Sequence, residues 1–122
     1  MPSSIGIAIV MSLFDKRSTV YGPETIVIGE FDSTADGFYR NVVTIPLTVK
    51  PKHLLYVKVT ADKPVDIVVA RSNGSAVQHK DGQTDIVMGP YPTEKEDSMG
   101  IIIGVFRGDR ATATVEAWME RK

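Results

Sequence analysis

The 122-residue sequence contains no cysteine, only two histidines, and almost no net charge. The absence of cysteine excludes disulfide bonds, cysteine zinc sites, iron–sulfur clusters and thiol nucleophiles. The 14 Lys and Arg residues against 15 Asp and Glu residues give a net charge of −1. That balance argues against a nucleic-acid binder, which normally carries a basic excess. We therefore expect no cofactor and no nucleic-acid partner.

The sequence also lacks a stretch long enough to cross a membrane. Its longest uncharged run near the start covers residues 1–14, whereas a membrane helix needs about 20 apolar residues. The charged residues Asp15, Lys16 and Arg17 follow this run, whereas a secretory signal carries basic residues before its apolar core. We therefore expect residues 5–14 to form a first β-strand in a cytoplasmic protein without a membrane span.

The length suits one domain, residues 1–122, and the apolar pattern predicts β-strands. Apolar residues alternate with period two or form short β-branched runs, which are bounded by Gly, Pro, Asp or Asn, and no window has helical periodicity. This pattern predicts an all-β protein, a single antiparallel β-sandwich of the jelly-roll-like kind with about eight strands. The expected strands cover residues 5–14, 25–31, 38–49, 54–60, 65–70, 85–88, 99–106 and 111–119.

Two hairpins can be predicted in register. A five-residue loop over residues 60–64 would pair Val59 with Val65 and bury the aliphatic residues of both strands on one face. A two-residue turn at Gly108 and Asp109 would pair strand 99–106 with strand 111–119. The core predicted from these registers contains Tyr39, Val43, Ile45, Leu47, Leu55, Val57, Val59, Val65, Ile67, Val69, Ile102, Phe106 and Val115.

Strand 99–106 is apolar on both faces, whereas a half-exposed antiparallel strand alternates apolar and polar residues. Something must therefore cover its second face. One interpretation is a contact with a partner, in which Trp118 would act as an anchor on an otherwise polar strand face. The other is that residues 5–14 of the same chain fold over it. The predicted interface residues are Met99, Ile101, Ile103, Val105 and Trp118.

Catalytic groups are not assembled by any recognisable motif. The only histidines, His53 and His79, lie at a strand start and in a predicted loop, and no Gly-x-Ser-x-Gly elbow accompanies a serine. A nucleophile, a base and an orienting group cannot be named together. We therefore expect a protein that is not an enzyme.

The acidic residues of the predicted loops allow an alternative function. Asp32 and Asp36 carry oxygen ligands of the type that calcium prefers, although their spacing is not that of an EF-hand loop. Asp81 and Asp85 flank another loop, and Tyr91 lies between two prolines in a connection that could carry binding function. These residues define a monomeric small-ligand module for carbohydrate or calcium, with Tyr91, Asp81 and Asp85 as ligand-binding residues and Asp32 and Asp36 as metal ligands.

The second half of the chain resembles the Golgi-dynamics (GOLD) type of β-sandwich and other jelly-roll-like modules. The resemblance rests on residues 56–59, on the turn from Asp62 to residues 65–68, and on the closing segment 103–109. It implies a sandwich fold and a non-catalytic role in protein or lipid contacts. The coiled coil and the cysteine pair found in many members are missing here, so the membrane-traffic role of that family is not carried over.

Taken together, these patterns predict a non-enzymatic interaction or structural protein that self-associates through the apolar strand face. A homo-oligomer is the expected assembly, and another protein is a further candidate partner. The monomeric ligand-binding module is the alternative.

Overall fold

The computed structural model describes residues 17–32, 38–93, 95, 97–106 and 108–121. Residues 5–14, expected to form a first strand, lie outside them. The described residues form eight strands and no helix: β1 (Arg17–Ile28), β2 (Glu30–Asp32), β3 (Phe38–Arg40), β4 (Val42–Thr48), β5 (His53–Arg71), β6 (Ala76–Pro92), β7 (Ser98–Gly104) and β8 (Ala111–Arg121). The prediction of an all-β antiparallel protein is confirmed.

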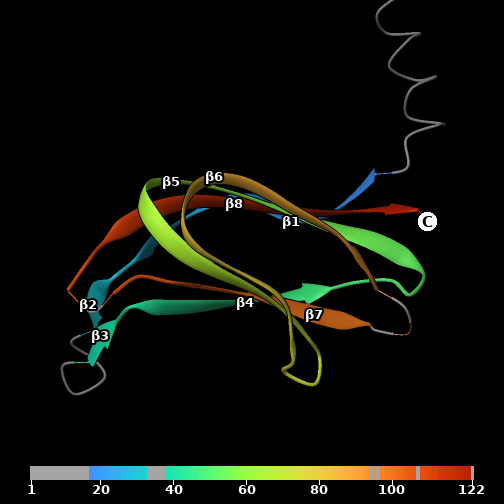
Figure 1. Ribbon diagram of the computed structural model, residues 1–122, viewed down its shortest axis with the longest axis horizontal. Helices are drawn as coiled ribbons and strands as arrows, with labels where there is room; N and C mark the ends of the chain where they lie inside the picture. Colours follow the sequence, from blue (N-terminus) through green and yellow to red (C-terminus); the bar gives the residue numbers. More distant parts are fainter. Residues whose placement is uncertain (1–16, 33–37, 94, 96, 107, 122) are drawn as a thin grey trace, which may run out of the picture.

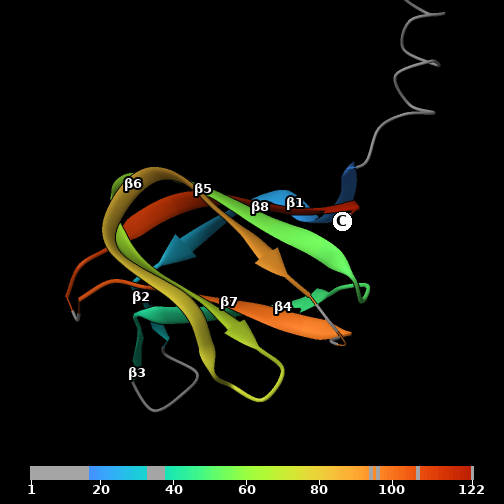
Figure 2. The ribbon, with the colours of Figure 1, turned by 45° about the vertical axis from the view of Figure 1, so that its right-hand side comes forward.

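Six of these strands form one antiparallel sheet in the order β1-β8-β5-β7-β4, with β6 beside β5, while β2 and β3 form a separate pair. β5 pairs with β8 over its first half and with β7 over its second half, and β6 follows its other edge. The sheet therefore bends along β5 and curls, so that β1 and β8 lie over β4 and β7 (Figures 1 and 2). The sequence predicted two packed sheets, whereas the two layers here belong to one continuous curled sheet.

The predicted hairpin at residues 60–64 is wrong, because β5 continues through this segment as one strand. Val59 pairs with Val115 of β8, and Val65 pairs with Gln83 of β6. Asp62 supports the extended course, since its carboxylate accepts a hydrogen bond from the Thr112 amide at 2.8 Å. The buried residues of both halves have odd numbers, so a continuous strand places them on one face just as the five-residue loop would.

The predicted pairing of the last two strands is also wrong. β7 pairs with β4 and β5, whereas β8 pairs with β1 and β5, so these two strands lie in different layers of the curled sheet. A tight turn does form between them, because the Asp109 amide donates to the Phe106 carbonyl at 2.9 Å and Gly108 adopts a φ of 98°. In a turn closed from residue 106 to residue 109, Gly108 takes the second loop position, whereas the prediction gave it the first. The turn therefore lies one residue earlier than predicted, and it connects layers instead of neighbouring strands.

The core fills the space between the layers with inward-facing residues of β1, β4, β5, β6, β7 and β8. Most of the predicted core residues are buried, which confirms them. Val43 is partly buried and packs against this core. Phe106 is the main error, because its side chain is 78% exposed, and Ile102 is half-buried on the other face. Tyr39 lies in β3, whose side chains are outside the description. The confirmed residues are Ile45, Leu47, Leu55, Val57, Val59, Val65, Ile67, Val69 and Val115.

A buried threonine fastens the start of β5 to the end of β6. Thr93 is fully buried, its hydroxyl donates to the Lys50 carbonyl at 2.6 Å, and the His53 amide donates to that hydroxyl at 2.9 Å. Its own amide donates to the His53 carbonyl at 2.9 Å. Since buried polar groups are costly without partners, this set of bonds fixes one end of the long hairpin.

Candidate interaction surfaces

Four of the five predicted interface residues lie in the core. Met99, Ile101, Ile103 and Val105 are 4%, 0%, 0% and 8% exposed. The register explains why, because Ile101 lies between Ile45 of β4 and Val69 of β5, both of which point inward. The assignment of faces to strand 99–106 was therefore inverted, and these four side chains cannot contact a partner in the folded chain.

The fifth predicted interface residue, Trp118, lies on the outer face of β8 but is covered. Its ring stacks on Tyr56 of β5, with centroids 5.4 Å apart, and the Arg17 guanidinium lies 4.2 Å from the Trp118 ring centroid. The Trp118 indole N–H also donates to Glu120 at 3.3 Å. These neighbours leave Trp118 only 9% exposed, so contacts within the chain already use the surface proposed for a partner.

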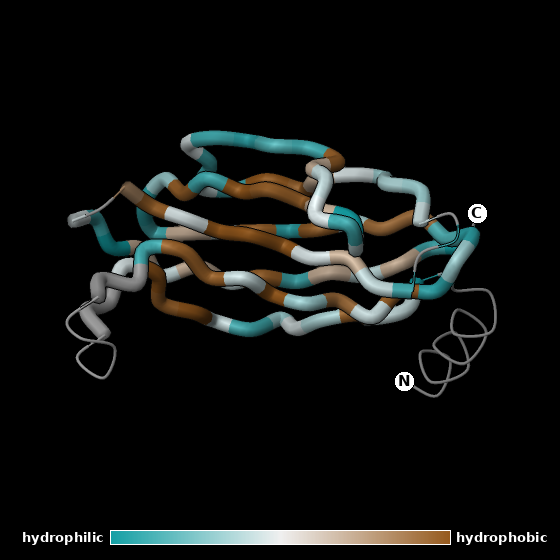
Figure 3. The backbone as a smooth tube through the Cα atoms, turned by 90° about the horizontal axis from the view of Figure 1, so that it is seen from below, coloured by the Kyte–Doolittle hydropathy of each residue, from teal (hydrophilic) through white to brown (hydrophobic). Residues whose placement is uncertain are grey.

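A different surface of β7 remains open. Its outward residues continue across the neighbouring strands: Ile102 pairs with Thr44 of β4 and Val68 of β5, and Gly100 pairs with Pro46 of β4. Six half-buried or exposed residues of this surface carry no charge, and we call them the outer apolar face, seen from its own side in Figure 3. It consists of Val42, Thr44, Pro46, Val68, Gly100 and Ile102. Asp66, in one row with Val42 and Gly104, and His79, the β6 partner of Val68, lie at its border.

Gly100 leaves a position on this face without a side chain. A Cβ atom on Gly100 would meet only the Ile45 carbonyl oxygen, at 3.7 Å, so the outer side of Gly100 has room for another group. Ile102, two residues further along the same strand, stands on the same side as a branched side chain. A raised and a low position therefore alternate along β7, which suits close approach by another sheet.

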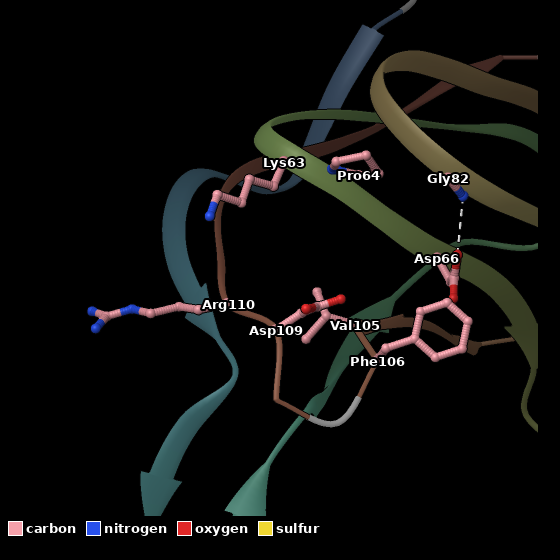
Figure 4. Close-up of a pocket in the computed structure, with 8 residues that line it drawn as sticks. All are labelled: Lys63, Pro64, Asp66, Gly82, Val105, Phe106, Asp109 and Arg110. Atoms are coloured by element: carbon pink, nitrogen blue, oxygen red, sulfur yellow. Dashed lines mark hydrogen bonds between the residues drawn. The ribbon is translucent and has the colours of Figure 1, made fainter.

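A cavity of about 230 Å³ lies at the end of this face, beside Phe106. Lys63, Pro64, Asp66, Gly82, Val105, Phe106, Asp109 and Arg110 line it (Figure 4). Asp66 is the β5 partner of Gly104, and its carboxylate accepts a hydrogen bond from the Gly82 amide at 2.9 Å. The cavity thus combines an exposed aromatic ring with side chains of both charge signs.

The predicted ligand-binding residues are not brought together. Tyr91 is 6% exposed, and its hydroxyl donates to Gln78, so it belongs to the interior. Burial raises the pKa of the Tyr91 phenol above its ordinary value of 10.0. Asp81 pairs with His79 at 2.5 Å in an exposed part of β6, whereas Asp85 pairs in register with Thr60 of β5.

Asp32 lies in β2 with its side chain outside the description, and Asp36 lies outside the described residues. Among the residues that can be described, no three His, Asp or Glu side chains form a group able to hold a metal ion. A calcium site at Asp32 and Asp36 stays a prediction. The described part of the chain also contains no helix long and apolar enough to cross a membrane.

Sequence reasoning missed the outer apolar face, although its signal was present. Gly100, Ile102 and Gly104 share one parity, and two glycines are poor core residues because they leave space unfilled. Phe106 was missed because its parity matched the face that was assigned to the core. Val42 and Phe106, which are 48% and 78% exposed, are two of the exposed large hydrophobic residues.

The described strands define an all-β protein built on one curled antiparallel sheet. In sequence, the chain matches no family model and no curated protein. In structure, it is similar to the crystal structure of Aeromonas hydrophila PliG, described as a periplasmic lysozyme inhibitor of g-type lysozyme. The two chains are 12% identical with a TM-score of 0.59, and the match covers 87% of this chain and 88% of that chain. A likeness at this identity concerns the fold alone.

Proposed function

We propose that this chain is a non-enzymatic interaction protein that self-associates through the outer apolar face. The observation that carries the proposal is the uncharged row of Thr44, Ile102 and Val68 across three neighbouring strands. Side chains of this kind favour burial against a second surface, since apolar area removed from water is the main source of association energy. A second copy of the chain offers a surface of the same shape, and two-fold pairing is the commonest assembly of soluble oligomers.

The opposite outer face supports the choice by contrast. There β1, β5 and β8 present Arg17, Lys58, Glu116 and Glu120, and Arg17 lies 3.8 Å from Glu116 in an ion pair. If two chains packed these charged faces against each other, charges of both signs would leave water. That transfer costs free energy unless each charge finds a partner. The uncharged face avoids this cost.

Proline also makes pairing at the sheet edges less favourable than pairing at the face. Each strand at an edge of the sheet contains a proline: Pro23 in β1, Pro46 in β4, and Pro90 and Pro92 in β6. Proline has no amide hydrogen, so it interrupts hydrogen bonding to an added strand. Face-to-face packing needs no backbone hydrogen bonds, and it is the mode that we propose.

A matched pair of substitutions tests the surface. Thr44 on edge strand β4 and Thr25 on edge strand β1 are both exposed and both point outward, but only Thr44 belongs to the outer apolar face. We expect Thr44→Lys to lower the average mass in light scattering, whereas Thr25→Lys leaves it unchanged. Both variants should keep the circular dichroism spectrum of the wild type. Equal masses for the two variants would refute the surface assignment.

A second candidate function is binding of a different protein at the cavity beside Phe106. The observation in its favour is that an aromatic side chain 78% exposed borders a cavity of about 230 Å³. Exposed aromatic residues are frequent anchors in protein contacts. The structural neighbour is described as an inhibitor of another protein, which agrees with such a role. Under this candidate, Phe106→Ser would abolish binding to the partner and leave self-association unchanged.

The finer assignment to the jelly-roll sandwiches is part of the same proposal. The jelly-roll-like sandwich and the resemblance to GOLD-type modules are both proposals. The two facing layers of the curled sheet support them. A cytoplasmic location also remains a proposal, which cell fractionation with an antibody against the chain would test. Recovery in a periplasmic or secreted fraction would contradict it.

A further inference from the structure

The turn between β5 and β6 contains a pair of residues whose chemistry none of the surfaces above uses. Asn73 is followed by Gly74, and both are exposed. Gly74 adopts a φ of 87°, and a Cβ atom there would meet nothing within 4 Å, so the turn is open to water. Asparagine followed by glycine is the pair in which a backbone amide can most easily reach the preceding side chain, because glycine adds no bulk.

Ser75 holds the side chain of Asn73 through two hydrogen bonds. The Ser75 hydroxyl donates to Asn73 Oδ1 at 2.6 Å, and the Ser75 amide donates to the same oxygen at 2.9 Å. Two donors on one carbonyl oxygen withdraw electrons from its carbon and stabilise the negative charge that develops when a nucleophile adds to that carbon. They also limit the side chain to a narrow range of orientations.

We propose that Asn73 is a site of spontaneous cyclisation and deamidation, assisted by Ser75. The Gly74 nitrogen forms a bond to Asn73 Cγ, and the bond from Cγ to the side-chain nitrogen breaks. The leaving nitrogen takes the proton from Gly74 and departs as ammonia, which leaves a five-membered imide. Water then adds to either carbonyl of the imide and opens the ring. The products are aspartate or isoaspartate, in which the main chain continues through the side-chain carbonyl. No oxidant, reductant or cofactor takes part.

One contact opposes the first step and makes it slow. The Gly74 amide donates to the Arg71 carbonyl at 2.9 Å, so this bond must open before the nitrogen can attack. The product places a new carboxylate in the turn that Arg71 and Ser75 close, where the Arg71 amide donates to the Ser75 carbonyl at 2.9 Å. Conversion therefore adds negative charge at one end of the hairpin, and it cannot be reversed by the chain itself.

The chain provides its own internal control, because Asn41 is the other asparagine. Asn41 donates through Nδ2 to the Val105 carbonyl at 3.1 Å and precedes the β-branched Val42. We would incubate the full chain at mildly alkaline pH, digest it with trypsin, and follow the replacement of amide by carboxylate by mass spectrometry. Residues 72–80 form one tryptic peptide, and Asn41 begins another.

We expect Asn73 to convert while Asn41 stays intact. Ser75→Ala should slow the conversion several-fold, because it removes the hydroxyl donor and keeps the amide donor. Ser72→Ala, at the other exposed serine of the turn, should convert at the wild-type rate. An unconverted Asn73, an equal rate at Asn41, or an unchanged rate in Ser75→Ala would each overturn the proposal.

Discussion

Tyr56 on β5 and Trp118 on β8 stack across the sheet, with ring centroids 5.4 Å apart and planes only 6° apart. With Arg17 over the indole ring, the pair closes a surface that could otherwise be a contact site. Aromatic stacking and cation–π contacts each add stability beyond the burial of area. The single tryptophan of the chain therefore has a structural role on the outer side of β8, away from the outer apolar face.

Trp118→Ala should accordingly lower the free energy of unfolding by about 3 kcal/mol, as for other large buried aromatic residues. Urea denaturation followed by circular dichroism measures the change. Thr114→Ala, on the same face of β8, is the control and should cost less than about 1 kcal/mol. If Trp118→Ala kept its stability and became a smaller species, Trp118 would be a partner contact after all.

Neighbouring isoleucines on β7 should respond in opposite ways to a charge. Ile103 is fully buried, so Ile103→Asp places a carboxylate in the core and should prevent folding. Ile102 lies on the outer apolar face, so Ile102→Asp should fold and should weaken self-association. Circular dichroism and light scattering separate the two effects. A folded Ile103→Asp variant would show that the faces of β7 are assigned wrongly.

Two glycines of β6 should differ strongly in their tolerance of a methyl group. Gly89 has a φ of 114°, and a Cβ atom there would lie 2.6 Å from the Leu55 carbonyl oxygen. Gly82 has a φ of 65°, and its Cβ would meet nothing within 4 Å. We expect Gly89→Ala to cost more than about 3 kcal/mol and Gly82→Ala about 1 kcal/mol, both from thermal unfolding. Equal costs would contradict the close approach of β6 to β5.

The interior position of Tyr91 predicts a loss of stability in alkaline solution. Burial raises the pKa of Tyr91, so the folded chain holds the phenolic proton more tightly than the unfolded chain does. Its contribution is therefore complete below the ordinary pKa of 10.0 and is lost as the pH rises through the folded pKa. Tyr91→Phe should flatten the decline in melting temperature above about pH 10. An unchanged decline would place the cause elsewhere.

The alternative of a small-ligand module makes a separate prediction. Calcium or a sugar that binds the folded chain would stabilise it by about 2.7 kcal/mol at 100 times its dissociation constant. Because Tyr91 is buried and Asp81 and Asp85 do not converge, we expect no shift in melting temperature with sugars. A shift with calcium would point to Asp32 and Asp36. A clear shift would favour the ligand-binding function over the outer apolar face.

The local character of the strands could be read from the sequence, but their partners could not. Period-two burial identified Val57 and Ile67 as inward-facing, and that holds in the structure. It could not tell whether residues 60–64 reverse the chain, because both courses keep odd residues on one face. The choice was made by contacts distant in sequence, such as the bond from the Thr112 amide to Asp62.

The sequence predicted an apolar contact face on β7 but placed it on the side that the structure buries. The apolar character of both faces of residues 99–106 was visible, and self-association followed from it. Which face turns inward depends on β4 and β5, whose odd-numbered residues Ile45 and Val69 flank Ile101. The assumed hairpin with β8 supplied the wrong neighbours and therefore the wrong face.

The mass of the wild-type chain in solution tests the central claim most directly. Size-exclusion chromatography with light scattering over about a hundredfold range of concentration reports association through mass action. Self-association through the outer apolar face predicts a mass that rises from one chain towards two as concentration increases, or a stable dimer throughout. A mass of one chain at every concentration would contradict the account.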